Sequence, residues 1–90
     1  MKLSQLEMFV EAANSGSITE AARRLNKSRS TVSTAISALE DSLGVSLFER
    51  GSNLTELTVI GEQILDDSER ILQIAYIIEQ KCQHYASGAE

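Results

Sequence analysis

Residues 16–44, GSITEAARRLNKSRSTVSTAISALEDSLG, carry the signals for two amphipathic helices joined by a short break. Ser17-Ile18-Thr19-Glu20 has the S-x-x-E pattern of a helix start, in which the serine side chain accepts a hydrogen bond from a backbone N–H three residues on. Asn26 tolerates left-handed backbone geometry, and Ser28 can cap a second, longer helix. This order of elements is typical of a helix-turn-helix, which we predict over residues 18–37.

Each of these two helices has one apolar face, and the spacing of its residues directs that face toward a shared core. The inward residues are Ile18, Ala21, Ala22 and Leu25 in the first helix and Val32, Ile36, Leu39 and Leu43 in the second. The small alanines let the helices approach closely, so the second helix is held with its other face outward. That outward face contains Ser30, Thr34, Ser37 and Asp41, with Arg29 and Ser33 at its edges.

The outward face of the second helix is the candidate binding surface. Short hydroxyl side chains allow a helix to lie deep in the major groove of DNA, where they can donate to phosphates or base edges. Arg29 could bind a guanine through two hydrogen bonds. The alternative is an ordinary solvated helix, because a polar outer face is what any surface helix shows.

The segments on either side complete a small, mainly α-helical domain. Ser4-Gln5-Leu6-Glu7 predicts the start of a helix that ends at Gly16 and whose apolar face is formed by Leu6, Phe9, Val10 and Ala13. After Gly44, the β-compatible residues 45–50 and 54–57 flank turn-forming residues 51–53 and predict a two-stranded ribbon. Thr58 can then cap a final helix that extends to about Tyr85.

Composition and charge limit the classes of protein to which this chain can belong. A chain of 90 residues with 42% hydrophobic residues and no proline suits one mostly helical domain. No apolar run is long enough to cross a membrane, so we expect a cytoplasmic protein without a membrane partner. The net charge of −5 argues at first against nucleic acid. However, all of the excess acid follows residue 50, and a local basic run is formed by Arg23, Arg24, Lys27 and Arg29.

Catalytic and metal sites find no support in the sequence. Cys82 is the one cysteine, which excludes an internal disulfide, and we expect it to be buried or interfacial. On a helix, Cys82 and His84 would point in nearly opposite directions, which argues against a shared metal ion. The serines lack a base in any catalytic pattern, and glycine-rich phosphate loops are missing. We therefore predict a protein that is not an enzyme and needs no metal or cofactor.

Several spaced motifs together resemble the N-terminal domain of LysR-type transcriptional regulators, in order and without gaps across residues 1–61. The motifs are LEMFV at 6–10, GSITEAARRL at 16–25, VS at 32–33, LE at 39–40, LGVSLFER at 43–50 and LTVIG at 57–61. The resemblance implies a winged helix-turn-helix over residues 1–58, with three helices and a small two-stranded wing. A long linker and dimerisation helix over residues 59–90 would follow.

The resemblance also assigns roles to single positions. The implied DNA contacts are Thr19, Arg23, Arg29, Ser30, Thr31, Ser33, Thr34, Ser37, Arg50 and Asn53. Arg29 stands where glutamine is commoner, and Asn53 stands near the position of a second wing arginine. Many relatives also have arginine, lysine or glutamine around positions 34–38, which this chain lacks. We therefore expect the isolated domain to bind DNA weakly, and to gain affinity by dimerising or through the rest of the regulator.

The last predicted helix is too long to be covered by so small a core, so its exposed isoleucines predict a partner, of which a second copy is the simplest. The predicted dimerisation residues are Ile64, Ile71, Ile74, Ala75, Ile78, Cys82 and Tyr85. In the LysR family the corresponding helices pair antiparallel. The alternative is a helix folded back on its own domain, as part of its N-terminal half must be in any case.

The sequence thus predicts a homodimeric LysR-type regulator that binds double-stranded DNA specifically, at an operator of approximate two-fold symmetry. The resemblance implies a homodimer, or a tetramer at full length, and a small-molecule co-inducer that acts only through a C-terminal domain absent here. We therefore expect the chain to be a DNA-binding fragment. The competing interpretation is a winged-helix module that binds proteins, favoured by the acidic composition and the weakly basic second helix.

Overall fold

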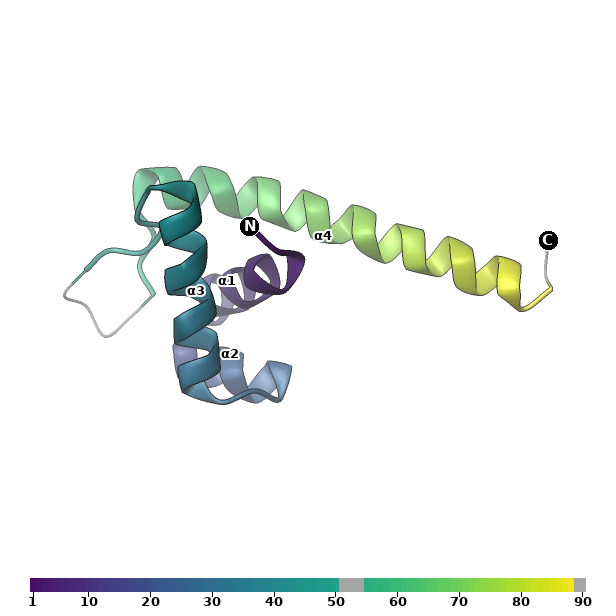
Figure 1. Ribbon diagram of the computed structural model, residues 1–90, viewed down its shortest axis with the longest axis horizontal. Helices are drawn as coiled ribbons and strands as arrows, with labels where there is room; N and C mark the ends of the chain where they lie inside the picture. Colours follow the sequence, from purple (N-terminus) through teal and green to yellow (C-terminus); the bar gives the residue numbers. More distant parts are fainter. Residues whose placement is uncertain (51–54, 89–90) are drawn as a thin grey trace.

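The computed structural model describes residues 1–50 and 55–88, and four helices account for most of them. In chain order they are α1 (Leu3–Ser15), α2 (Ile18–Leu25), α3 (Arg29–Leu43) and α4 (Val59–Ala86). The first three gather at one end of the molecule, and α4 crosses this group and continues well past it (Figure 1). The molecule is therefore elongated, with extents of 52 × 25 × 19 Å. The prediction of a mainly α-helical fold with a long last helix is confirmed.

The signals predicted for the helix-turn-helix are present at each helix end. Ser17 Oγ accepts a hydrogen bond from the Glu20 N–H at 3.1 Å, and Ser28 Oγ accepts one from the Thr31 N–H at 3.1 Å. Asn26 is left-handed, with φ of 57°, and turns the chain between α2 and α3. Both caps satisfy N–H groups that have no partner within the helix, so these boundaries are determined locally.

The start of α1 differs from the prediction. The helix begins at Leu3, and no serine caps it. Instead, Gln5 Oε1 accepts a 3.0 Å hydrogen bond from the Lys2 N–H, which ties the first turn to the residue before it. The predicted capping box at Ser4 is therefore wrong. The longer side chain of Gln5, one position later, already binds the backbone N–H of Lys2 at the start of the helix.

The hydrophobic core is built around α1, which contacts each of the other three helices. Its buried surface is therefore wider than the single stripe predicted from the sequence. Met8 and Ala12 are buried, whereas Ala13, which was predicted to face the core, is not part of the buried cluster. The other buried apolar residues are Leu6, Phe9, Val10, Ala21, Ala22, Val32, Ile36, Leu39 and Leu47.

The segment between α3 and α4 turns back toward the core. Phe48 and Leu57 form an antiparallel bridge, beside a 2.7 Å hydrogen bond from the Glu49 N–H to the Glu56 carbonyl. Within the described residues, this bridge is the part of the predicted two-stranded ribbon that the structure shows. The rest of that prediction falls on residues 51–54, which lie outside the described residues.

The start of α4 depends on Thr58 and Gly61. Thr58 Oγ1 accepts a hydrogen bond from the Gly61 N–H at 2.9 Å, as the sequence predicted, and donates one to the Ser46 carbonyl at 2.7 Å. Gly61 is buried so closely against the preceding segment that a Cβ there would lie 2.1 Å from the Leu47 carbonyl oxygen. Glycine is therefore required at this crossing.

Among the residues that the structure describes, the first half of α4 is the part that packs against the other helices. Its partly buried apolar side chains on the core are Ile64, Leu65 and Leu72, and Asn14 of α1 donates a 3.1 Å hydrogen bond to Glu69. Further along, several large side chains are open to solvent, with exposed fractions of 57% for Ile74, 56% for Ile78 and 77% for Tyr85. The alternative prediction, in which α4 folds back on its own domain, therefore holds for the first half of the helix. None of the described helices is long and apolar enough to cross a lipid bilayer.

Candidate nucleic-acid interface

α3 presents a small, polar surface on the side away from the core. Three residues anchor the opposite side of the helix, since Val32, Ile36 and Leu39 are buried. The candidate contact residues on α3 are all exposed, namely Arg29, Ser30, Thr31, Ser33, Thr34 and Ser37. Because most of these side chains are short, the backbone of α3 can come close to a bound surface.

A shallow depression lies between the starts of α2 and α3. It is lined by Ser17, Ile18, Thr19, Arg29, Ser30 and Ser33. The fold therefore brings Thr19 together with three of the candidate contacts on α3, although Arg29 lies ten positions after Thr19 in the sequence. Both helices begin here, and helix starts favour anionic groups such as phosphate because their first N–H groups lack partners and carry partial positive charge.

A second depression joins α3 to the start of α1. Its lining residues are Gln5, Ser30, Thr31, Thr34, Ala35 and Ala38. Gln5 was not among the residues that the sequence predicted, because only the packing of α1 brings it beside α3. Its Oε1 accepts the Lys2 N–H, which leaves the side-chain amide N–H groups able to donate. The Thr31 hydroxyl, by contrast, lies 2.7 Å from Ser28 Oγ and is already engaged.

A third depression lies at the end of α3, where it brings Ser37 and Arg50 together. The rest of its lining is Glu40, Asp41, Gly44, Val45 and Ser46. Glu40 Oε2 accepts hydrogen bonds from the N–H groups of Leu47 at 2.6 Å and Phe48 at 3.2 Å, so this carboxylate anchors the chain that follows α3. Asp41 is exposed. An anion beside Arg50 would therefore also meet the negative charge of Asp41.

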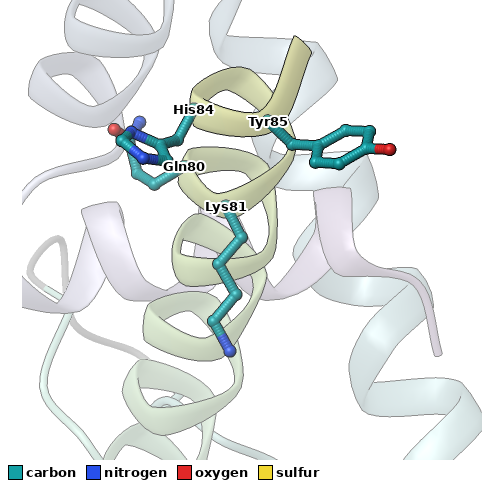
Figure 2. Close-up of a pocket in the computed structure, with 4 residues that line it drawn as sticks. All are labelled: Gln80, Lys81, His84 and Tyr85. Atoms are coloured by element: carbon teal, nitrogen blue, oxygen red, sulfur yellow. The ribbon is translucent and has the colours of Figure 1, made fainter. Parts of the chain in front are cut away.

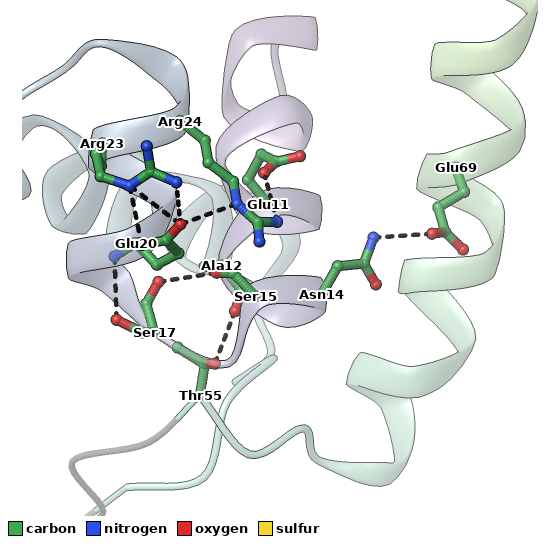
Figure 3. Close-up of polar contacts among 10 residues, drawn as sticks. All are labelled: Glu11, Ala12, Asn14, Ser15, Ser17, Glu20, Arg23, Arg24, Thr55 and Glu69. Atoms are coloured by element: carbon green, nitrogen blue, oxygen red, sulfur yellow. Dashed lines mark hydrogen bonds and ion pairs between the residues drawn. The ribbon is translucent and has the colours of Figure 1, made fainter.

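The predicted run of basic residues is partly neutralised within α2. Arg23 Nε lies 3.1 Å from both carboxylate oxygens of Glu20, and Arg24 Nε lies 3.2 Å from Glu20 Oε2 (Figure 3). Arg24 also approaches Glu11 of α1 at 3.6 Å. Lys27, Arg29 and Arg50 form no ion pair with any residue in 1–50 or 55–88. Among the predicted basic contacts, those that form no ion pair within these two ranges therefore lie around α3. The predicted contact Asn53 lies outside the described residues.

The Glu20 cluster predicts a specific dependence of stability on acid. The hydrogen bond from Arg23 is the largest influence and, with the charges of Arg23 and Arg24, lowers the pKa of Glu20 from 4.5 to about 2. A depressed folded-state pKa contributes stability that is present above the unfolded value and is lost as the pH falls from about 4.5 to about 2. Urea unfolding of Glu20→Gln over this range should lack that loss, whereas Glu62→Gln should retain it. An identical acid dependence in Glu20→Gln and wild type would contradict the assignment.

Comparison with known proteins places this fold and surface in a family. The family model that matches residues 3–62 is described as a bacterial regulatory helix-turn-helix protein of the lysR family. The chain belongs to the LysR family. The HTH-type transcriptional regulator ClcR of Pseudomonas putida is 43% identical over 77 residues, which are 86% of this chain and 26% of that protein. TfdS of Cupriavidus pinatubonensis is 45% identical over 74 residues, or 82% of this chain and 25% of that protein.

Solved structures agree with this assignment over almost the whole chain. The chain in the CbnR_DBD–DNA complex has a TM-score of 0.85 and 36% identity, covering 96% of this chain and 99% of that one. The chain in the BenM_DBD/catB site 1 DNA complex has a TM-score of 0.92 and 30% identity, covering 100% and 97%. The chain thus corresponds to the helix-turn-helix part of LysR-family regulatory proteins, with a following long helix. It spans about a quarter of the length of its curated relatives.

Proposed function

We propose that this LysR-family domain binds double-stranded DNA sequence-specifically as a homodimer, with α3 in the major groove. The observation that carries the proposal is the outer face of α3, where exposed hydroxyls and Arg29 lie opposite three buried anchors. A helix held in this way can present a constant pattern of donors to base edges. Solved chains with this fold, which are described as DNA complexes, support the same use of the surface.

Residues 1–58 form the proposed DNA-binding head. Its proposed contacts are those of the sequence prediction, namely Thr19, Arg23, Arg29, Ser30, Thr31, Ser33, Thr34, Ser37, Arg50 and Asn53. The three depressions that border α3 support all of these except Arg23 and Asn53. The wing, a two-stranded ribbon extending from the Phe48–Leu57 bridge, would reach the DNA backbone or minor groove with Arg50 at its base.

Residues 59–90 form the proposed dimerisation helix. The solvent-exposed large apolar side chains in the second half of α4 support a partner, and a second copy supplies an identical helix. The antiparallel sense follows the family resemblance, and two heads related by a two-fold axis would suit an operator of approximate two-fold symmetry. In a longer protein, a tetramer, a co-inducer bound through a C-terminal domain, and a cytoplasmic site of action would complete the regulator.

The test is fluorescence anisotropy of the domain with an operator selected from random sequences and with unrelated duplexes, over a series of salt concentrations. We expect Arg29→Ala to cost about 1–3 kcal/mol on the selected site and to relax specificity, because it removes a proposed base contact. Arg50→Ala should weaken binding equally on all sequences and reduce the salt slope by about 1, as the loss of a phosphate contact does. Arg70→Ala removes a cation from α4 and should change neither property.

The affinity of the isolated domain for DNA distinguishes this proposal from the alternative of a protein-interaction module. Because Glu20 occupies Arg23 and Arg24, we expect a dissociation constant weaker than roughly 10⁻⁸ M at physiological salt. Tighter binding would contradict the expected weakness of the isolated domain. No binding at low salt would instead favour a protein-interaction module, or a head that works only in a full-length assembly.

A further inference from the structure

A regularly spaced series of α4 side chains, most of them exposed, includes two charges. Starting at Ile60, alternate steps of four and three residues define what we call the α4 stripe. Its apolar members are Ile60, Ile64, Ile71, Ile74, Ile78 and Tyr85, and its two charged members are Asp67 and Lys81. An average step of about 3.5 residues keeps one side of a helix in contact with a second helix along its length.

The two charges of the α4 stripe are placed symmetrically. Ile74 lies midway between Asp67 and Lys81 in the sequence. Asp67 contacts Arg70 one turn later on the same helix, but both side chains are largely exposed, with fractions of 57% and 74%. Exposed ion pairs of this kind contribute little free energy, so Arg70 does not prevent Asp67 from taking another partner.

Lys81 has the reach to meet such a partner. Its side chain stretches along α4 toward the earlier turns, with Tyr85 on one side of it and Gln80 and His84 on the other (Figure 2). Its ammonium group forms no ion pair with the residues that the structure describes. A flexible aliphatic stem with a charge at its end can cover an apolar interface and still reach an acid at its edge.

We propose that two copies of this chain pair through the α4 stripe about a two-fold axis near Ile74, so that each Asp67 binds the partner's Lys81. This inference rests on the proposed homodimer and specifies its register. In an antiparallel pair centred on Ile74, the two charges exchange partners reciprocally, because they are equally distant from the axis. In a parallel pair in register, Asp67 would meet Asp67 and Lys81 would meet Lys81, and such like-charge contacts oppose association.

The charges matter because the isoleucines alone do not select one register. A shift of seven residues along the partner still places isoleucine against isoleucine over much of the α4 stripe. It would, however, separate Asp67 from the partner's Lys81 and leave both charges against apolar side chains. The charged pair therefore penalises the shifted alternatives, as polar residues at helix interfaces do elsewhere.

Charge reversal tests the register by sedimentation equilibrium at low salt. We expect Asp67→Lys and Lys81→Asp each to raise the dimer dissociation constant about ten-fold or more, because two attractive contacts per dimer become repulsive. The double variant Asp67→Lys/Lys81→Asp should return to within about three-fold of wild type, since the pairs are restored with reversed signs. Glu62→Lys, an exposed reversal outside the α4 stripe, is the matched control and should leave the dimer unchanged.

The outcomes distinguish the register from the dimer itself. A wild-type chain that stays monomeric would overturn the proposed homodimer. A dimer that tolerates both single reversals, or that the double variant fails to restore, would overturn the register alone. Cys82 gives an independent check, because antiparallel pairing about Ile74 holds the two Cys82 residues roughly 24 Å apart along the helices. A disulfide-linked dimer upon mild oxidation would therefore also contradict the proposal, since disulfides need Cα atoms within about 7 Å.

Discussion

Replacing Ile71 and Ile78 together by lysine is expected to convert the proposed dimer into a folded monomer. Their exposed fractions of 38% and 56% in the single chain leave them available to a partner. Burying an aliphatic side chain of this size contributes about 1.5–3 kcal/mol, and the double variant removes four from each dimer. We expect the dimer dissociation constant to rise by more than about 1,000-fold, measured by sedimentation equilibrium with circular dichroism as the check on folding.

A matched control separates the position of the new charges from their number. Tyr76→Lys/Gln83→Lys also adds two lysines seven residues apart on α4, but on a face that lies outside the α4 stripe. Both positions are exposed, so the helix and the dimer should persist. We further expect the monomeric variant to lose operator affinity while each head retains its own weak binding, because the dimer links two binding events. A dimer that survives Ile71→Lys/Ile78→Lys would rule out this face of α4.

Gly61→Ala is expected to destabilise the domain by about 3 kcal/mol or more. The reason is steric, since the added Cβ would lie 2.1 Å from the Leu47 carbonyl oxygen and 3.0 Å from its carbon. The backbone at Leu47 cannot move away freely, because its N–H is bound by Glu40 and its side chain is fully buried. Urea unfolding of the variants and the wild type at one protein concentration measures the change, because a common concentration keeps any contribution from dimerisation comparable.

Gly16→Ala is the control for the general cost of replacing a glycine. Gly16 is left-handed, with φ of 75°, but a Cβ there would meet no atom within 4 Å. We expect a cost of about 1 kcal/mol, from the backbone conformation alone. If Gly61→Ala proved no more costly than Gly16→Ala, the close crossing of α4 over Leu47 would not contribute to stability as argued.

Local chemistry made the helix boundaries predictable. Ser17, Ser28 and Thr58 each accept the backbone N–H that their spacing predicted, and Asn26 and Gly16 adopt the left-handed geometry expected of a helix end. These interactions join residues within one turn, so they do not depend on the rest of the fold. The start of α1 was the exception, because Gln5 competed with Ser4 within the same turn.

The candidate site was predictable in part, for a related reason. The periodicity of α3 was enough to expect that Ser30 and Thr34 would face outward, because helical spacing relates every exposed position to the buried ones. The sequence contained no signal that Gln5 would belong to the site, because Gln5 reaches α3 only through the packing of α1. Nor did it indicate that Glu20 would hold Arg23 instead of reaching back to its own helix start.

Residue order alone was therefore sufficient for the helices, all of their ends that were predicted except the start of α1, the outward face of α3 and the family to which the chain belongs. Tertiary packing decided the width of the core around α1, the requirement for glycine where α4 crosses Leu47, and which of the basic side chains remain unpaired around α3. The division has a physical cause. Caps and helical periodicity act between residues a few positions apart, whereas close approaches and ion pairs depend on which distant segments the core brings together.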